Sequence, residues 1–293
     1  MSLVIAAFAA VYVIWGSTYL GIRLAIDSIP PLLMAGARFM LAGCILYGAM
    51  RAFGAARPDR VHWRSAFIIG GLLLLGGNGG VSWAQQTVPS GIAALVVAAV
   101  PLWIILVDWL RPSGRRPSIL VWLGLAIGFG GVVLLVMGKN QLGQRIVNPA
   151  GAVALIFATI TWAFGSVYSR HAPKPKSALL AVAMQMMAGG FLQFLAGFAL
   201  GEAHSFSWAR ITPASAWAFV YLTLVGSLVG FTAYVWLLQV STPAKVSTYA
   251  YVNPLIAVGL GHWILNEPVP KSILLAGALI LAAVILITRR GSR

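Results

Sequence analysis

The chain consists almost entirely of long apolar segments, and this feature constrains its fold more than any other. The segments are nearly free of charge and are separated by short stretches rich in Pro, Gly and basic residues. An α-helix needs roughly 20 such residues to cross the hydrocarbon core of a bilayer. The sequence therefore predicts ten membrane-spanning helices, at residues 3–25, 32–50, 65–85, 91–110, 118–138, 150–169, 178–200, 215–238, 246–265 and 271–288.

The composition favours a membrane protein over a soluble one. Of the 293 residues, 60% are hydrophobic and 9% are charged, whereas a soluble domain has about 25% charged residues. The net charge of +15 comes from short basic runs between apolar segments, so no nucleic-acid partner is expected. The single cysteine, Cys44, cannot form a disulfide within the chain and is interpreted as a buried apolar residue.

The distribution of basic residues predicts how the chain is oriented in the membrane. If the N-terminus is cytoplasmic, fourteen of the twenty Lys and Arg residues lie in cytoplasmic loops or in the C-terminal tail. Cytoplasmic loops of membrane proteins carry an excess of Lys and Arg. The first apolar run lacks the basic start of a signal peptide and is expected to be retained as a helix. Both termini are therefore expected in the cytoplasm.

The sequence contains an internal repeat. The phrase "WGSTY" at 15–19 returns as "FGSVY" at 164–168, and "MLAGCIL" at 40–46 matches "MMAGGFL" at 186–192. From the third span onward the offset is a steady 153 residues, which aligns Pro101 with Pro254 and Trp83 with Trp236. The chain is interpreted as two repeats of five helices each, at residues 1–145 and 146–293.

Because five is an odd number, the second repeat must be inverted relative to the first. The loop "RPSGRRP" at 111–117 is basic and predicted inside, whereas its counterpart "NEPVP" at 266–270 has no basic residue and is predicted outside. Inverted repeats with a substrate site near the membrane midplane are typical of secondary transporters. The predicted fold is an all-α integral membrane protein, with ten transmembrane helices forming two inverted five-helix repeats around a central cavity.

Two prolines are candidate hinges of such a transporter. Pro101 and Pro254 lie near the middle of the fourth and ninth spans, at equivalent positions of the two repeats. A proline within a helix removes one backbone donor and kinks the helix. The kinks are interpreted either as hinges or as packing features.

Aromatic and polar residues inside the spans are candidates for substrate binding. Aromatic rings with a few polar groups suit a planar, amphipathic ligand. The candidate residues are Trp15, Tyr19, Arg38, Asn78, Trp162, Ser166, Tyr249, Tyr251 and Asn253.

Several of these residues allow a second interpretation. Tyr and Trp near span ends are usually interfacial belt residues. Arg38 either extends its charge to the membrane interface or presents a fixed cation to a substrate carboxylate. Asn78, in the stretch "GGNGG", either binds ligand or hydrogen-bonds the backbone.

The sequence resembles the EamA family of the drug/metabolite transporter superfamily over essentially its whole length. The similar stretches are "IWGSTYLGIR", "PPLLMAGARF", "GNGGVSWAQQTVPSGIAALVVAAVP", "ITWAFGSVYSR" and "STYAYVNPLIAVGLG". The resemblance implies a ten-helix protein of the bacterial inner membrane that exports amino acids, notably aromatic ones, or related metabolites and drugs.

The leading hypothesis is a secondary transporter that exports small amphipathic metabolites by alternating access, acting as a monomer. The alternatives are an intramembrane enzyme that modifies lipids or metabolites, and a passive channel. An enzyme of that kind normally needs carboxylates, His or a metal at one membrane face. The five acidic residues lie at span ends or in loops, and the four His show no metal-binding spacing. No catalytic residue, metal or cofactor is therefore expected.

Overall fold

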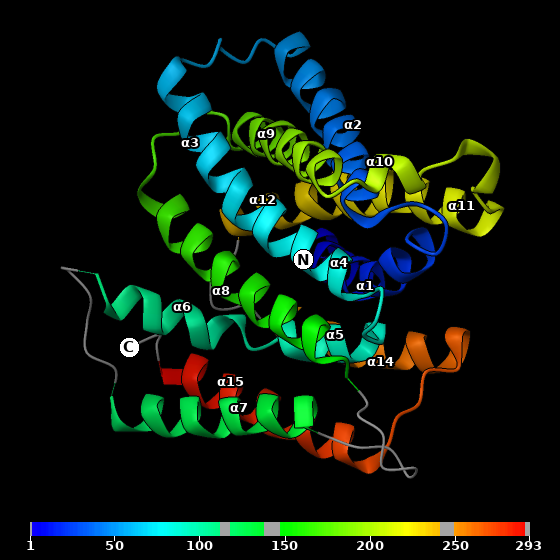
Figure 1. Ribbon diagram of the computed structural model, residues 1–293. Helices are drawn as coiled ribbons and strands as arrows, with labels where there is room; N and C mark the ends of the chain where they lie inside the picture. Colours follow the sequence, from blue (N-terminus) through cyan, green and yellow to red (C-terminus); the bar gives the residue numbers. More distant parts are fainter. Residues whose placement is uncertain (1, 112–117, 138–146, 241–248, 291–293) are drawn as a thin grey trace.

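The computed structural model describes residues 2–111, 118–137, 147–240 and 249–290, and in these ranges the chain folds into a bundle of helices (Figure 1). The first part of the chain forms α1 (Ser2–Ala25), α2 (Pro31–Ala52), α3 (Arg60–Gly70), η1 (Gly71–Gly79), α4 (Gly80–Ala84), α5 (Ser90–Val97), α6 (Val100–Trp109) and α7 (Ile119–Met137). The second part forms α8 (Pro149–His171), α9 (Ala178–Ala199), α10 (Glu202–Ser205), η2 (Trp208–Arg210), α11 (Pro213–Tyr221), η3 (Leu222–Val229), α12 (Gly230–Val240), α14 (Tyr249–Leu265) and α15 (Lys271–Arg290).

Seven of these helical stretches are long and apolar enough to cross a membrane, and three shorter apolar helices accompany them. The seven are Leu3–Ala25, Pro31–Ala52, Arg60–Ala84, Ser90–Trp109, Pro149–His171, Ala178–Ala199 and Pro213–Tyr234. The shorter helices are Ile119–Leu134, Val252–Leu265 and Lys271–Ala283. The prediction of an all-helical membrane protein is confirmed, and the number of ten crossings stays a prediction.

The third span begins earlier than the sequence predicted. Helix α3 starts at Arg60 rather than at residue 65. The ring Nδ1 of His62 accepts a hydrogen bond from the backbone N–H of Asp59 at 3.1 Å, which satisfies one of the donors left open at a helix start. This polar turn carries the helix beyond the apolar segment, so hydropathy alone placed the boundary too late.

Helix starts elsewhere follow familiar local signals. The side chains of Asn148, Ser177 and Thr212 accept hydrogen bonds from backbone N–H groups in the first turns of α8, α9 and α11. Proline follows at the first helical position of α8 and α11, where its missing N–H group is not needed.

The helices pack in pairs that join the two parts of the chain. Helix α2 packs along α9, α7 packs along α15, and α5 packs against α14. Figure 1 shows α7 and α15 side by side at one edge of the bundle, with α2 and α9 near the opposite edge. Each pair consists of a predicted span and its counterpart in the other repeat. The division into repeats at 1–145 and 146–293 stays a prediction.

Helices α2 and α9 approach each other through glycines. A Cβ atom added at Gly190 would lie 2.8 Å from the backbone nitrogen of Met40 and 2.9 Å from the carbonyl oxygen of Gly36. A Cβ atom at Gly43 would lie 2.8 Å from the backbone nitrogen of Met187. Small residues allow such close backbone contact between membrane helices. The two helices therefore form a rigid pair.

One face of α2 is turned away from the bundle. Leu41 and Ile45 are 49% and 51% exposed, and Cys44 between them is exposed too. The expectation that Cys44 is buried is wrong. An apolar face of this kind needs no protein partner in a membrane, because lipid tails cover it.

Three of the long spans depart locally from regular α-helix. Segments η1 and η3 are π-helical and lie at corresponding places in the third and eighth spans. The fourth span is broken at Ala98–Ala99, immediately before Pro101 in the first turn of α6. Helix α14, by contrast, continues through Pro254 without an assigned break. The two candidate hinges thus differ in local structure, and a hinge function for either proline stays a prediction.

Candidate functional site

Four aromatic rings from three helices form a cluster around Trp15. The ring centroid of Trp15 in α1 lies 5.3 Å from Phe231 and 4.9 Å from Tyr234, both in α12, and 5.0 Å from Tyr249 in α14. The rings of Tyr234 and Tyr249 are 5.9 Å apart. These separations are those of favourable ring pairs. We call these four residues the aromatic cluster; it unites two predicted site residues, Trp15 and Tyr249.

Next to this cluster, Asn253 joins α14 to α1. Its side chain is 7% exposed. In the amide orientation that satisfies both of its ends, its NH₂ group donates to the backbone carbonyls of Tyr249 at 3.1 Å and of Tyr12 at 3.2 Å. Because these donors are already used, Asn253 fits a role in holding the two helices together better than one in binding a carboxylate.

Two further predicted residues lie on the same helices. Tyr19, one turn beyond Trp15 on α1, is partly buried and packs against the largest hydrophobic core cluster. The side chain of Tyr251 lies outside the described part of the structure.

Arg38 of α2 is buried inside the protein. Its side chain is 3% exposed, and its Nε donates to the Ser227 hydroxyl of η3 at 3.1 Å. Its guanidinium carbon lies 4.2 Å from the ring centroid of Phe39, within the range of a cation–π interaction. The Nη1 atom is buried and has no hydrogen-bond partner. The side chain therefore does not extend to the membrane interface, and it keeps an unused donor group inside the bundle.

Packed side chains connect Arg38 to the aromatic cluster. Phe39, which lies beneath the guanidinium group, forms a core cluster with Leu74 and Met186, and Phe231 packs against this cluster. Phe231 in turn contacts Trp15. The Arg38 cation and the aromatic cluster are thus parts of one continuous packed region.

The two π-helical segments are each held by a polar side chain from the other repeat. Arg38 of α2 donates to Ser227 in η3, and Gln193 of α9 donates through Nε2 to the Leu74 carbonyl in η1 at 2.8 Å. The offset of 153 residues aligns Leu74 with Ser227. Gln193 and Ser227 were not among the predicted site residues. The only signal in the sequence for Gln193 and Ser227 was that each is a polar residue in an apolar span, because their bonding partners are distant in sequence.

Trp162 and Asn78 form a second group, between α8 and η1. A Cβ atom added at Gly77 would lie 2.7 Å from Cε3 of Trp162, so the indole packs directly on the η1 backbone. The neighbouring Asn78 has a buried side-chain oxygen without a hydrogen-bond partner. Trp162 thus packs on the η1 backbone beside the position of Asn78, and among the described residues no ring contact joins Trp162 to the aromatic cluster.

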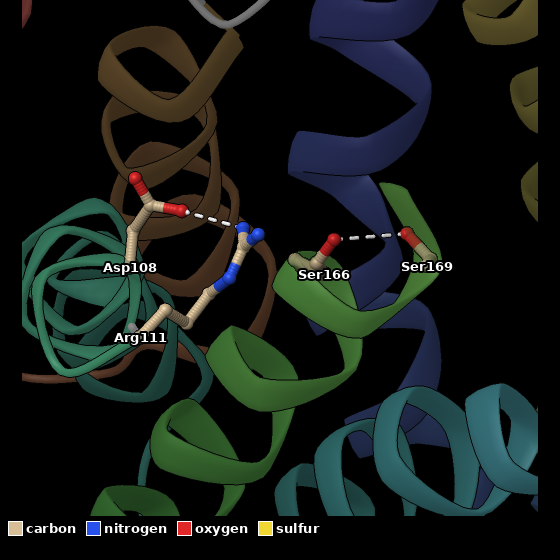
Figure 2. A network of polar contacts seen from close by, with 4 residues as sticks. All are labelled: Asp108, Arg111, Ser166 and Ser169. Atoms are coloured by element: carbon tan, nitrogen blue, oxygen red, sulfur yellow. Dashed lines mark hydrogen bonds and ion pairs between the residues drawn. The ribbon is translucent and has the colours of Figure 1, made fainter. Parts of the chain in front are cut away.

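Ser166 is used within its own helix. Its hydroxyl donates to the Trp162 carbonyl at 2.7 Å, and its carbonyl accepts from the Ser169 hydroxyl at 2.9 Å. Figure 2 shows these serines in α8 near the Asp108–Arg111 ion pair at the end of α6, whose N–O distance is 3.1 Å. The hydroxyl proton of Ser166 is therefore engaged with the backbone, and a ligand would have to accept this hydrogen bond in place of the Trp162 carbonyl.

An apolar groove of about 690 Å³ lies between α1, α9 and the η3–α12 span. Three of its lining residues, Ala7, Ala233 and Trp236, also pack in the core cluster that contains Trp15, Tyr234 and Tyr249. The groove is thus adjacent to the aromatic cluster. The sequence predicted a central cavity whose walls carry aromatic rings and a few polar groups; this groove is lined by Trp236 and, as its single aliphatic hydroxyl, by Thr232.

Within the described ranges, no group of three His, Cys, Asp or Glu residues could hold a metal ion. The polar chemistry inside the spans consists of donors such as Arg38, hydroxyl groups and amides. Seven helices long and apolar enough to cross a membrane define a polytopic membrane protein, and its interior holds a buried cation and clustered aromatic rings.

The chain belongs to the EamA-like transporter family, whose pattern matches residues 2–137 and 149–289. The resemblance seen in the sequence is thereby confirmed. A relative in Escherichia coli (strain K12), the uncharacterized inner membrane transporter YedA, is 41% identical over 96% of this chain and 89% of its own length. The protein is therefore a multi-pass transporter of the bacterial inner membrane.

More distant similarities also cover nearly the whole chain. A probable amino-acid metabolite efflux pump of the same organism is 25% identical, covering 95% of this chain and 90% of its own. Protein PecM of Dickeya dadantii is 28% identical, covering 94% and 88%. A solved crystal structure covers 100% of both chains with a TM-score of 0.65 and 20% identity, which shows the similarity of fold alone.

Proposed function

We propose that this transporter exports small amphipathic metabolites, most of all amino acids that include aromatic ones, by alternating access between two inverted repeats. The observation that carries the proposal is the link between buried Arg38 and the aromatic cluster. The free Nη1 donor of Arg38 is suited to a substrate carboxylate, and the rings around Trp15 suit a planar side chain.

Two further observations support this substrate class and direction. A probable amino-acid metabolite efflux pump is 25% identical to this chain over nearly its whole length. The groove beside the aromatic cluster is apolar, which favours solutes with an apolar part. A small-molecule substrate and a lipid bilayer follow from membership of the family; action as a monomer is part of the proposal.

The alternatives from other classes are weaker. A lipid- or metabolite-modifying enzyme would need several reactive side chains at one place. Asp108, in the last turn of α6, is instead paired with Arg111. A passive channel needs no helix that changes shape, whereas the π-helical segments of the third and eighth spans and the turn at Ala98–Ala99 in the fourth span are places where a helix can bend. Counterflow separates the three: a carrier exchanges labelled for unlabelled substrate, an enzyme changes it chemically, and a channel shows no accelerated exchange.

Replacing Trp15 by alanine should weaken transport of phenylalanine more than that of alanine. Loss of one good ring contact, about 1.4 kcal/mol, corresponds to a roughly tenfold higher apparent KM. Uptake is measured in liposomes at matched protein amounts. Trp162→Ala tests the second group in the same assay, because Trp162 has no ring contact with the aromatic cluster.

The control for this experiment is Trp217→Ala. Trp217 is 73% exposed, so its loss removes an indole without touching the aromatic cluster. Equal losses for phenylalanine and alanine in the Trp15 variant would assign the aromatic cluster to the scaffold. Absence of flux for any amino acid in the unmodified protein would contradict the proposed substrate class.

The orientation is also open to a direct test. On a Cys44→Ala background, a cysteine at Trp208, which is 81% exposed, should react with an impermeant thiol reagent in intact spheroplasts. A cysteine at Lys176, in the loop before α9, should react only after lysis. The reverse pattern would contradict cytoplasmic termini and the charge argument behind them.

A further inference from the structure

The carboxylate of Glu267 binds the first turn of a helix in the other repeat. Its Oε1 accepts from the backbone N–H of Ser90 at 2.7 Å, and its Oε2 accepts from the Gly91 N–H at 3.1 Å and the Ser90 hydroxyl at 3.0 Å. The first N–H groups of a helix have no partner within the helix, and the helix dipole favours a negative charge there. Glu267 follows α14 and thus ties the end of α14 to the start of α5.

Glu202 makes the same kind of contact in another helix pair. At the end of α9, its carboxylate accepts from the backbone N–H groups of Leu32, at 3.0 and 3.2 Å, and of Leu33, at 2.9 Å. Partial burial raises the pKa of this carboxyl, and the two backbone donors act in the opposite direction. Glu202 thus ties the end of α9 to the start of α2. Both carboxylates lie at the ends of the helices predicted to face outward.

The two helix pairs differ in how they are packed. In the α2–α9 pair, backbone meets backbone through Gly36, Gly43 and Gly190, so separation would break contacts along the whole helix. In the α5–α14 pair, a Cβ atom at Gly91 would lie 2.9 Å from Cγ2 and 3.0 Å from the backbone Cα of Val258. This contact lies at the N-terminal end of α5, next to the residues that Glu267 binds.

Helix α5 is also separated from the rest of its span. The break at Ala98–Ala99 divides it from α6. Helix α5 packs on α14 and also on α1 and α8, whereas α6 packs mainly on α8. If the bonds to Glu267 are released, the turn at Ala98–Ala99 is the point about which α5 would pivot relative to α6.

We propose that Glu267 is the latch of a gate between α5 and α14: it holds α5 in the closed state and releases it when this end of the transporter opens. Glu202, in the rigid α2–α9 pair, keeps its contact throughout the cycle. The inference rests on the proposed alternating-access function and adds to it the position and the chemistry of one gate. The loop equivalent to 266–270 in the first repeat, 111–117, contains no acidic residue, so the opposite end lacks this carboxylate.

The test measures the distance between spin labels at the gate. Cysteines replace exposed Gln86, before α5, and Trp263, on α14, in the full chain with Cys44→Ala, reconstituted in lipid nanodiscs. Glutamine at position 267 keeps one acceptor oxygen but loses the charge. Because a hydrogen bond to a charged group is worth much more than a neutral one, Glu267→Gln should raise the ratio of long to short distances by about tenfold.

Glu202→Gln is the matched control. It removes the same charge at a rigid pair, so it should lower thermal stability and leave the distance distribution unchanged. Ser90→Ala is the milder second variant: it removes the hydroxyl donor to Glu267 and should shift the ratio in the same direction, by less, even if Glu267→Gln does not fold. An unchanged distribution in the variants at 267 and 90, or an equal shift in Glu202→Gln, would overturn the proposal.

The measurement is made without substrate, so its outcome does not depend on what is transported. If flux assays found no amino acid transport while the distances shifted as expected, the proposed substrate class would be wrong and the proposed latch would be supported. If transport of amino acids were found with unchanged distances, the proposed latch would be wrong and the proposed function would be supported.

Discussion

A leucine at Gly190 should eliminate folded protein. A single added Cβ atom would already lie 2.8 Å from a backbone nitrogen and 2.9 Å from a backbone oxygen of α2, and backbone atoms within a helix cannot move aside individually. Overpacking of a tight interface by one or a few carbons typically destabilises by about 1–3 kcal/mol. Gly190→Ala should therefore lower the thermal stability in detergent, and Gly190→Leu should leave only aggregated protein in size-exclusion chromatography.

Gly48→Leu serves as the control for this prediction. Gly48 lies in the same helix pair, on α2, and a Cβ atom there would have no neighbour within 4 Å. This variant should accumulate and elute as the unmodified protein does. Normal elution of Gly190→Leu would show that α2 and α9 separate easily, and it would also remove the basis for treating this pair as rigid.

Replacing Arg38 by methionine should abolish most transport of carboxylate substrates without harming the fold. A hydrogen bond to a charged group contributes about 1.5–3 kcal/mol, which corresponds to a roughly 10- to 150-fold rise in apparent KM. The buried guanidinium has one hydroxyl partner and an unpaired Nη1. Burying an incompletely paired charge is costly, and methionine removes this cost, so the melting temperature should stay equal or rise.

Two variants complete this experiment. Arg38→Lys keeps the charge as a single point and should recover only part of the transport, because the planar guanidinium can bind a carboxylate through two parallel bonds. Ser227→Ala removes the partner of Nε and should affect transport less than Arg38→Met does. If Arg38→Met lowered the amount of folded protein but left transport per folded molecule unchanged, Arg38 would be assigned to the structure of the α2–η3 contact instead of to substrate binding.

Residue type selected the candidate site residues, but it did not give their arrangement. Trp15 and Tyr249 were selected as aromatic residues inside predicted spans, but their contact depends on α1 lying beside both α12 and α14. Tyr234 and Phe231 complete the cluster and were not selected, because nothing in the sequence separates them from the other aromatic residues of the spans. Asn253 was selected for its polarity, yet its amide bonds two backbone carbonyls, a role that a sequence pattern does not distinguish from ligand binding.

The sequence by itself determined the membrane fold, because segments of about 20 uncharged apolar residues are stable only where lipid surrounds them. It also predicted the repeat, from matching residues such as Pro101 and Pro254. Only the tertiary structure decided which helices meet and where polar groups find partners. Hydrogen bonds such as those of Arg38 to Ser227, Gln193 to Leu74 and Glu267 to Ser90 join residues 119 to 189 positions apart. Their physical reason is the same in each case: a polar group removed from water must bond to whatever donor or acceptor the packed helices bring within reach.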